Sequence, residues 1–439
     1  MHYFEYSNNE LHCEYVPISA IAESQGTPFY LYSLKTLRRH YQVFDQAFAG
    51  MPHLVCFAAK ANSNIAVLRA LINEGGGVDV VSGGELFRAL TAGADPKKIV
   101  YSGVGKRRDE ISYALDAGIL MFNVESSQEL ELINTVAGQK GAKAPIALRV
   151  NPDVDPLTHP HISTGLKENK FGIDIGHSIG EYRRARELSN LEIIGVDCHI
   201  GSQILNIRPF LEAMDSLKDL IGLLRQEGID IRYLDIGGGL GIAYDQETPP
   251  HPRDYARVVS EKARDTGCTL ILEPGRVIVG NAGILVTRVL YTKYGSHKNF
   301  IIVDAGMNDL IRPSLYDSYH QILPVLEKER EPVVADIVGP ICESSDYFVK
   351  DRKVPRFDQG DLVAVMSAGA YGFTMASNYN SRPRAAELLV SGSAVEVIKK
   401  RETYQDLIRG ESIPERLSRH GTETVQGSGL PVMETGGKK

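Results

Sequence analysis

The chain has 439 residues, 43% of them apolar, which suffices for one large domain plus a smaller one or for two to three of ordinary size. Its 48 basic and 55 acidic residues give a net charge of −7 without a long basic run, so we expect no nucleic acid as partner. No apolar stretch reaches the roughly 18 residues of a membrane span, and the N-terminus lacks a secretion signal. We expect a cytoplasmic protein with no membrane partner.

The five cysteines do not have the spacing of a structural site. They are Cys13, Cys56, Cys198, Cys268 and Cys342. Their odd number and the lack of a CxxC pair argue against a disulfide framework and against a zinc site. We expect reduced thiols, as in a cytoplasm, and no metal.

From residue 54 to residue 273, short apolar segments alternate with longer segments of helical character. The predicted strands are residues 54–60, 78–82, 99–103, 121–125, 145–150, 193–199, 233–236 and 269–273. The predicted helices are residues 65–74, 85–92, 109–117, 128–137, 182–189, 210–226 and 255–265. Strands that alternate with helices pair in parallel through crossovers, and eight such units predict a closed (β/α)8 TIM-like barrel.

After residue 280 the pattern changes to short segments rich in Val and Ile, with loops instead of helices between them. The predicted strands are residues 284–294, 300–304, 333–338, 362–366, 387–390 and 394–399. We therefore predict a barrel over residues 27–280 and a β-domain made of residues 1–26 and 281–410. Residues 411–439 are polar and rich in Gly and Ser, and we expect this tail to be mobile.

Lys60 is the most informative residue for function. It ends the first apolar segment of the barrel and is followed by the polar sequence Asn62-Ser63-Asn64. Desolvation at the end of a buried strand lowers the pKa of an amine and makes it available to attack a carbonyl. We predict a nucleophilic lysine on this basis; the alternative is a side chain that reaches solvent where the strand stops.

Four further features fall at predicted strand ends, where barrels collect their catalytic groups. They are Arg149, His199, the run Gly237-Gly238-Gly239, and Glu273. The alternative for the histidine is a purely structural role, and the alternative for the glycines is a simple turn. Because all these features meet Lys60 at one end of the barrel, we predict an active site there.

The glycine run and the sequence Glu273-Pro274-Gly275-Arg276 can offer backbone N–H groups to a phosphate. A lysine amine, a phosphate site and a carboxylate in one barrel favour pyridoxal 5'-phosphate as cofactor, with the carboxylate keeping its pyridine nitrogen protonated. His199 would stack on the cofactor ring. A barrel with a Schiff-base lysine but without this cofactor, such as an aldolase, is the rival; it has no need for a carboxylate like that of Glu273.

These motifs resemble the fold-type III pyridoxal-phosphate decarboxylases, whose fold is like that of alanine racemase. The motifs are Phe-Ala-Ala-Lys-Ala-Asn at 57–62, His-Ile-Gly-Ser-Gln at 199–203, the glycine run and Glu-Pro-Gly-Arg at 273–276. Further motifs narrow the resemblance to the diaminopimelate decarboxylases. They are Arg-Val-Asn-Pro at 149–152, Ile-Ser-Thr-Gly at 162–165, Lys-Phe-Gly at 170–172, Cys-Glu-Ser-Ser-Asp at 342–346 and Gly-Ala-Tyr-Gly at 369–372. The resemblance runs from about residue 27 to about residue 400.

The resemblance implies a role for each matching residue. Lys60 would carry the cofactor, and Cys342 would donate a proton from the partner subunit, which makes a homodimer the implied minimum. The residues expected around the cofactor are Lys60, His199, Ser202, Gly237, Gly238, Gly239, Glu273, Gly275, Arg276 and Tyr371. The residues expected to hold an amino-acid substrate are Arg276, Arg312, Tyr316, Glu343 and Tyr371.

The implied reaction is removal of one carboxylate of meso-2,6-diaminopimelate to give L-lysine and CO2, the last step of lysine synthesis. The residues fit this substrate, because the planar fork of Arg312 suits its distal carboxylate and Glu343 suits its distal ammonium. A relative that acts on ornithine, arginine or carboxynorspermidine is the nearest alternative; in the ornithine enzymes an Asp follows the equivalent cysteine. A catalytically silent cofactor-binding regulator is a third possibility, but such a protein should have lost Lys60 or Cys342.

Overall fold

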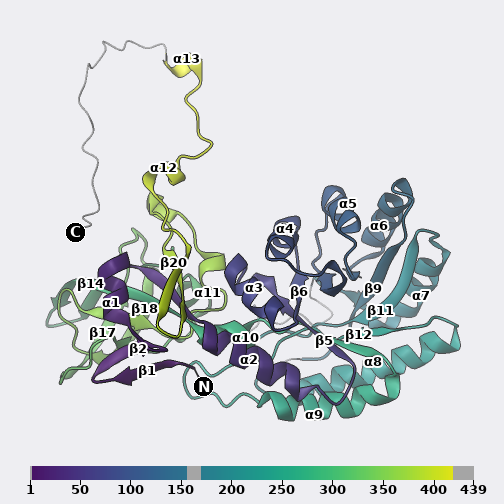
Figure 1. Cartoon of the computed structure of the whole chain (residues 1–439), viewed down its shortest axis with the longest axis horizontal. Helices are drawn as coiled ribbons and strands as arrows, with labels where there is room; N and C mark the ends of the chain where they lie inside the picture. Colours follow the sequence, from purple (N-terminus) through teal and green to yellow (C-terminus); the bar gives the residue numbers. More distant parts are fainter. Residues whose placement is uncertain (1, 156–169, 419–439) are drawn as a thin grey trace.

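The computed structural model describes residues 2–155 and 170–418, and within them eight parallel strands close into a barrel (Figure 1). The strands are β5 (His53–Ala58), β6 (Gly77–Val80), β7 (Ile99–Tyr101), β8 (Met121–Val124), β9 (Ala144–Asn151), β11 (Leu191–Asp197), β12 (Tyr233–Asp235) and β13 (Thr269–Leu272). β13 pairs with β5, and β8 pairs with β9, which closes the ring. The predicted barrel is confirmed, and each predicted strand overlaps one of these eight.

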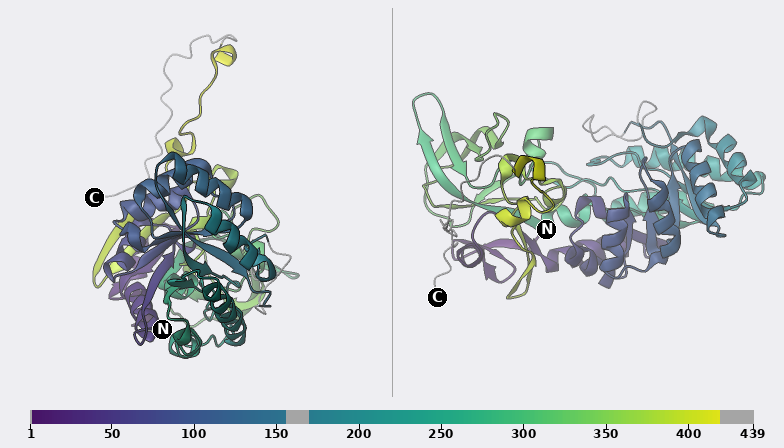
Figure 2. Two further views of the ribbon diagram at one scale, coloured as in Figure 1. Left: turned by 90° about the vertical axis from the view of Figure 1, so that its right-hand side faces the viewer. Right: turned by 90° about the horizontal axis from the view of Figure 1, so that it is seen from above.

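Helices follow the strands and surround the barrel, as the left view of Figure 2 shows. They are α3 (Ile65–Asn73), α4 (Gly83–Thr91), α5 (Arg108–Ala117), α6 (Ser127–Gln139), α7 (Ile175–Glu187), α8 (Arg208–Gln226) and α9 (Pro252–Ala263). Side-chain caps start several of them: Asn64 accepts from the amide of Ala66 at α3, and Ser82 from that of Glu85 at α4. Asp174 caps α7 by accepting from the amide of Gly176, which explains why this helix begins at residue 175 rather than at the predicted 182.

Helix α2 (Leu34–Ala47) was not predicted. It precedes β5 and packs against α3 and α9, so it completes the helical layer around the barrel. The two-residue strand β10 (Ile173–Asp174) pairs with β9 outside the ring, and α10 (Arg276–Val279) follows β13.

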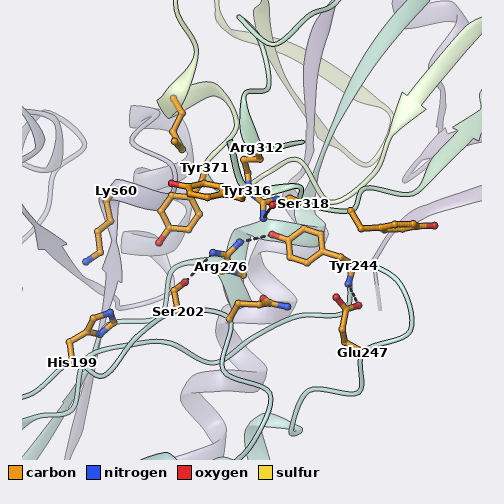
Figure 3. Close-up of a pocket in the computed structure, with 13 residues that line it drawn as sticks. Lys60, His199, Ser202, Tyr244, Glu247, Arg276, Arg312, Tyr316, Ser318 and Tyr371 are labelled. Carbon is orange, nitrogen blue, oxygen red and sulfur yellow. Dashed lines mark hydrogen bonds between the residues drawn. The ribbon is translucent and has the colours of Figure 1, made fainter. Parts of the chain in front are cut away.

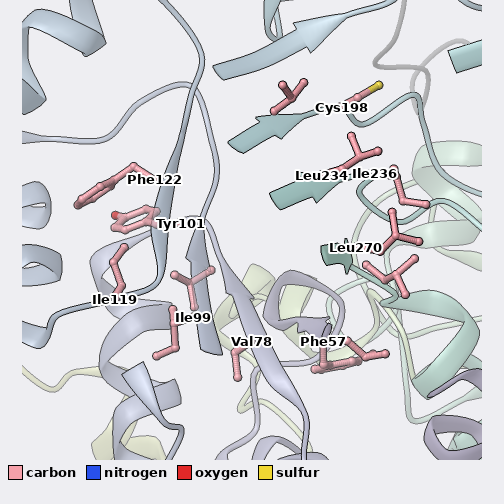
Figure 4. Packing of buried hydrophobic residues seen from close by; sticks show 14 of the residues in the cluster. Phe57, Val78, Ile99, Tyr101, Ile119, Phe122, Cys198, Leu234, Ile236 and Leu270 are labelled. Atoms are coloured by element: carbon pink, nitrogen blue, oxygen red, sulfur yellow. The ribbon is translucent and has the colours of Figure 1, made fainter. Parts of the chain in front are cut away.

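The barrel strands bury apolar side chains on both of their faces. Outward residues such as Phe57, Val78 and Leu234 pack under the helices (Figure 4). Inside the ring, a separate apolar cluster consists of Cys56, Val100, Met121, Ala147, Ile194 and Ile271. Because successive side chains of a strand point to opposite faces, the inward positions nearer the C-terminal strand ends form the next layer. These positions hold Asp79, Ser102, Asn123, Arg149, Asp197, Asp235 and Glu273, all of them buried.

A second sheet forms the β-domain. Its order is β18-β17-β15-β14-β4-β20-β21, with β19 paired to β14 and β16. The strands are β4 (Phe29–Ser33), β14 (Gly283–Tyr294), β15 (Asn299–Val303), β16 (Ile322–Pro324), β17 (Pro332–Val338), β18 (Tyr347–Pro355), β19 (Leu362–Val365), β20 (Ala386–Ser391) and β21 (Ala394–Lys399). Helix α11 (Arg312–Tyr316) lies between β15 and β16. β16, β18 and α11 were not predicted; in β18 a charged stretch at the edge of the sheet hides the strand pattern.

The predicted barrel boundary at residue 27 is too early. β4 pairs with β14 and β20 of the second sheet, so the chain enters the barrel only at α2. The opening segment, β1 (Phe4–Ser7), β2 (Glu10–Cys13), β3 (Val16–Pro17) and α1 (Ile18–Gln25), packs on the same sheet, where Phe4 and Leu11 share a cluster with Leu388.

At the C-terminal end, α12 (Tyr404–Leu407) and α13 (Glu415–Ser418) lead away from the β-domain (Figure 1). The tail beyond residue 418 and the motif at 162–165 lie outside the described residues. All five cysteines are free. Among the helices of the described residues, none has the length and apolar character to cross a membrane.

Candidate active site

A cavity of about 320 Å³ lies at the C-terminal ends of the barrel strands, between the barrel and the β-domain (Figure 3). Seven of the predicted site residues line it: Lys60, His199, Ser202, Arg276, Arg312, Tyr316 and Tyr371. The remaining lining residues are Gln203, Tyr244, Glu247, Ser318, Tyr319 and Met375. Of the five strand-end features that were predicted to meet, Lys60 and His199 line this cavity, whose volume is that of a small-molecule site.

Lys60 lies in a short helical turn, Ala59–Ala61, directly after β5 rather than within the strand. Its ammonium forms an ion pair with Asp79 on the neighbouring strand β6. Burial by itself lowers the pKa of Lys60, but the carboxylates of Asp79 and Glu273 together outweigh burial, and the net pKa is raised. The predicted lowering of this pKa is therefore wrong for the chain by itself, because the prediction considered desolvation without the carboxylate on the next strand.

Glu273 belongs to the polar layer inside the barrel, one residue beyond β13. Its Oε1 accepts from Ser102 Oγ at 3.2 Å and from Asn123 Nδ2 at 3.4 Å. One oxygen each of Asp197, Asp235 and Glu273 lies within 4.8 Å of the others. Burial, followed by the charge of Asp79, raises the pKa of Glu273 to about 7, while Lys60 acts in the opposite direction. A positive charge brought close to Glu273 would therefore stabilise its ionised form.

Asp197, Asp235 and Arg149 complete this layer. Burial raises the pKa of both aspartates well above the usual range, with a further contribution from Glu273. Arg149 donates to Glu125 at 2.8 Å and is 6% exposed. Arg149 therefore lies below the cavity and is paired, instead of lining it. Its positive charge favours the ionised state of Glu273 from inside the barrel.

His199 follows β11 and lines the cavity as a neutral ring. Its Nδ1 accepts from the amide of Gly238 at 3.0 Å. Burial, with the positive charges of Arg149 and Lys60 nearby, lowers the pKa of His199 well below its usual value. The ring can therefore offer a flat, uncharged face to a ligand over the physiological pH range.

The glycine run is required by close packing. A Cβ on Gly238 would lie 2.2 Å from the carbonyl oxygen of Glu273, and one on Gly239 would lie 2.6 Å from that of Gly201. The amides of Gly237 and Gly238 donate to Asp235 and His199. In the described part of the chain, only the amide of Gly239 has no hydrogen-bond partner within this run. The amide of Gly239 therefore has no intrachain partner to give up on binding a phosphate, whereas those of Gly237 and Gly238 already donate within the chain.

Two buried guanidinium groups dominate the charge of the cavity. Arg276 donates from Nη1 to the Tyr244 hydroxyl at 2.7 Å and from Nη2 to Ser202 Oγ at 3.0 Å (Figure 3). Its Nε is buried without a partner among the described residues. Arg312 lies 4.6 Å from the centre of the Tyr244 ring and donates to Ser318 Oγ at 3.3 Å.

Within the described residues, neither guanidinium forms an ion pair with a carboxylate. Burial raises the pKa of Tyr244, but the two guanidinium groups lower it by a larger amount. The net pKa of Tyr244 is therefore lowered. A buried charge without a counter-ion is costly. The arrangement is therefore typical of a site that receives anionic groups, such as a phosphate and a carboxylate.

Tyr371 and Gly275 bring the β-domain against the lysine. The amide of Tyr371 donates to the carbonyl of Ala61 at 2.8 Å, and its ring lies 4.9 Å from the Arg276 guanidinium carbon. Tyr371 has a left-handed backbone (φ 55°), a conformation that is uncommon for residues other than glycine and recurs at ligand sites. A Cβ on Gly275 would lie 3.0 Å from that of Ala61, which keeps this turn close to the lysine.

Cys342 and Glu343 do not line the cavity of their own chain. Both are exposed on the β-domain, where Asn380 accepts from the amide of Cys342 at 2.7 Å. Four residues at or near the site were not predicted from the sequence: Asp79, Asn123, Asp235 and Tyr244. For the first three a signal existed, since each is a polar residue flanked by apolar neighbours within a strand, as in Val78-Asp79-Val80.

The residues present fit pyridoxal phosphate. A lysine amine reaches the cavity, a buried carboxylate lies close enough to affect the lysine's pKa, and a neutral imidazole lines the same wall. The unpaired Nε of Arg276 and the amide of Gly239 can receive phosphate oxygens. These are the groups that such a cofactor requires from its protein.

Comparisons with known proteins agree with this site. Residues 34–280 match the family described as pyridoxal-dependent decarboxylase, pyridoxal binding domain. A diaminopimelate decarboxylase of Pseudomonas aeruginosa is 54% identical over 93% of this chain and 99% of its own length. The structure of the Helicobacter pylori diaminopimelate decarboxylase with L-lysine has a TM-score of 0.87 at 45% identity, covering 89% of this chain and 98% of that one. The M. jannaschii enzyme, also with L-lysine, has a TM-score of 0.90 at 40% identity, covering 94% and 98%.

Proposed function

The chain belongs to the diaminopimelate decarboxylases of the pyridoxal-dependent decarboxylase family, and from this premise we propose the reaction of its cavity. The protein removes one carboxylate of meso-2,6-diaminopimelate to give L-lysine and CO2, the last step of lysine biosynthesis. The observation that carries this proposal is the pair of buried guanidinium groups without carboxylate partners, beside a lysine amine in one cavity. One suits a phosphate and the other the carboxylate that the product keeps.

Pyridoxal phosphate, when bound, supplies a protonated ring that takes up the electrons left behind when CO2 departs. Lys60 holds the cofactor through its amine, and Asp79 is placed to receive the lysine's ammonium when the amine is released. Glu273 keeps the pyridine nitrogen protonated, and that positive charge in turn stabilises the ionised form of Glu273. His199 contributes a neutral face, which does not compete with the ring nitrogen for a proton.

Substrate recognition falls to the β-domain side of the cavity. Arg312 receives the distal carboxylate in a two-pronged contact, while Tyr316 and Tyr371 offer hydroxyl groups beside it. Arg276 and Ser202, already hydrogen-bonded to each other, hold the phosphate end together with Gly239 and Gly275. Ornithine carries no distal carboxylate, so it leaves Arg312 buried and unpaired, which disfavours it as a substrate.

Cys342 and Glu343 act on the cavity of a second copy. Cys342 donates a proton from Sγ to the substrate Cα, and Glu343 binds the distal ammonium. Their exposed position outside the cavity of their own chain supports a homodimer with shared sites. Mixing Lys60→Ala protein with Cys342→Ala protein tests this sharing: mixed dimers regain up to about a quarter of the activity, because one of the two sites is intact in half of the molecules. Two inactive variants that stay inactive when mixed contradict it.

The free thiols and the absence of a membrane-spanning helix among the described residues are compatible with a cytoplasmic enzyme, which we propose. The alternative of a decarboxylase for ornithine, arginine or carboxynorspermidine keeps the fold and the cofactor but changes the specificity. A silent cofactor-binding protein is disfavoured, because both Lys60 and Cys342 are present.

CO2 release from the protein loaded with pyridoxal phosphate distinguishes these alternatives. Meso-diaminopimelate, L-ornithine and L-arginine are assayed separately under the same conditions. Turnover of diaminopimelate alone is the expected result. Turnover of ornithine or arginine in its place would overturn the substrate assignment, and no turnover of any of them would contradict the proposed reaction.

A further inference from the structure

A buried histidine outside the predicted site is hydrogen-bonded to Arg312. His320 lies between α11 and β16 and is fully buried. Its Nδ1 lies 2.8 Å from the carbonyl oxygen of Met366, and its Nε2 lies 2.9 Å from Arg312 Nη1. A carbonyl can only accept and a guanidinium can only donate. The proton is therefore on Nδ1 and the lone pair on Nε2, which defines one neutral tautomer.

Two further contacts fix the position of His320. Arg352 donates to its carbonyl oxygen at 2.7 Å, and the Tyr244 ring packs edge-on against the imidazole with centroids 5.4 Å apart. β16 pairs with β19, the strand that leads into Met366, so the acceptor of the Nδ1 proton belongs to the same sheet. The His320 ring is thus fixed in one orientation, with its Nε2 lone pair directed at the Arg312 guanidinium.

Because His320 is a neutral acceptor, its hydrogen bond does not cancel the positive charge of Arg312. A carboxylate at this position would orient Arg312 equally well, but it would neutralise the guanidinium before a substrate arrived. Burial, together with the charge of Arg312, lowers the pKa of His320 to about 3, so the ring stays neutral at physiological pH. Ser318, which also accepts a hydrogen bond from Arg312, is uncharged as well. The positive charge of Arg312 is therefore kept for a ligand.

We propose that His320 is a positioning and specificity residue, which aims the Arg312 guanidinium at the distal carboxylate of the substrate and leaves its charge uncompensated. The proposal rests on the proposed function, since it takes this carboxylate as the ligand of Arg312. It predicts that His320 acts on the binding of substrates with a distal carboxylate and has little effect on the chemical step or on the cofactor.

Two amide variants separate the two hydrogen bonds of His320. In His320→Gln, the side-chain oxygen can reach the place of Nε2 and accept from Arg312. In His320→Asn, the shorter amide can replace only the Nδ1 donor to Met366. We expect KM for diaminopimelate to stay within about threefold in His320→Gln and to rise about 10- to 100-fold in His320→Asn, the range for a hydrogen bond to a charged group. We expect kcat to change less than about threefold in both.

Ligand binding to the cofactor-loaded protein gives a readout that does not depend on turnover. L-lysine retains the carboxylate that Arg312 would bind, whereas 1,5-diaminopentane lacks it. His320→Asn should weaken the affinity for L-lysine by the same factor as KM and leave that for 1,5-diaminopentane unchanged, as measured by the absorbance of the cofactor. In an Arg312→Ala background, His320→Asn should have no further effect on KM.

Equal KM values in the two amide variants, or equal losses of affinity for both ligands, would overturn the proposal and leave His320 a purely structural residue. Thermal unfolding and cofactor affinity of each variant identify a general loss of structure. Failure of the wild-type protein to decarboxylate diaminopimelate would instead contradict the proposed function, so the two failures are distinguishable.

Discussion

Replacing Arg312 with alanine tests how the cavity recognises its substrate. Arg312 is 5% exposed, so a carboxylate that binds it is largely removed from water. Truncating one partner of such a buried charge pair costs about 2–5 kcal/mol. Water can enter the cavity of about 320 Å³ and Arg276 remains nearby, which favours the lower end, about 2–3 kcal/mol. Because about 1.4 kcal/mol corresponds to a factor of ten, kcat/KM should fall about 30- to 140-fold.

The loss should appear mainly in KM, measured from initial rates of CO2 release over a range of diaminopimelate concentrations. Arg330→Ala is a matched control, since Arg330 is a partly buried arginine of the β-domain that pairs with Asp361 and does not line the cavity. The control should lower the stability but leave KM unchanged. An unaltered KM in Arg312→Ala, or an equal increase in both variants, would refute the assignment of Arg312 to the distal carboxylate.

Three further predictions concern the cofactor and stability. Lys60→Ala should abolish turnover, because no other amine of the described residues lines the cavity; near-normal CO2 release would exclude the assigned role. Glu273→Gln should lower kcat about 100-fold or more, because a neutral amide does not keep the pyridine nitrogen protonated; a kcat close to the wild type would contradict this. Partial burial raises the pKa of Glu402, but hydrogen bonds, led by that from Arg384, bring it down to about 2. The stabilisation from this lowered pKa is complete above the unfolded value of about 4.3 and lost as the pH falls towards 2. Arg384→Ala should reduce that pH dependence in denaturant titrations, and an unchanged dependence would show that Glu402 does not contribute.

The barrel was predictable because its strands are short, apolar and regularly separated. Each predicted strand overlaps an observed one, and errors occur at the ends, where hydrogen bonding rather than composition decides the last residue. Helix α2 was missed because it precedes the first strand, so the strand-then-helix pattern left no place for it. β4 was placed in the wrong domain because its partners, β14 and β20, come more than 200 residues later in the chain.

Most of the cavity was also predictable, but its electrostatics were not. Desolvation of Lys60 could be inferred from the strand that precedes it, whereas the opposing effect of Asp79 depends on the pairing of β5 with β6. The polar layer inside the barrel leaves a trace in the sequence, because Asp79, Asn123 and Asp235 interrupt apolar strands at inward positions. His320 has no such trace, since its importance comes from the tautomer that its two partners impose.

The proposed specificity is tested most sharply by the products formed from two competing substrates. Purified protein with pyridoxal phosphate is given meso-diaminopimelate together with an equal amount of L-ornithine, and CO2, L-lysine and 1,4-diaminobutane are quantified. We expect lysine and CO2 in equal amounts and almost no 1,4-diaminobutane. Formation of 1,4-diaminobutane as the main amine, or CO2 without lysine, would contradict the assignment of the two buried guanidinium groups to a phosphate and a distal carboxylate.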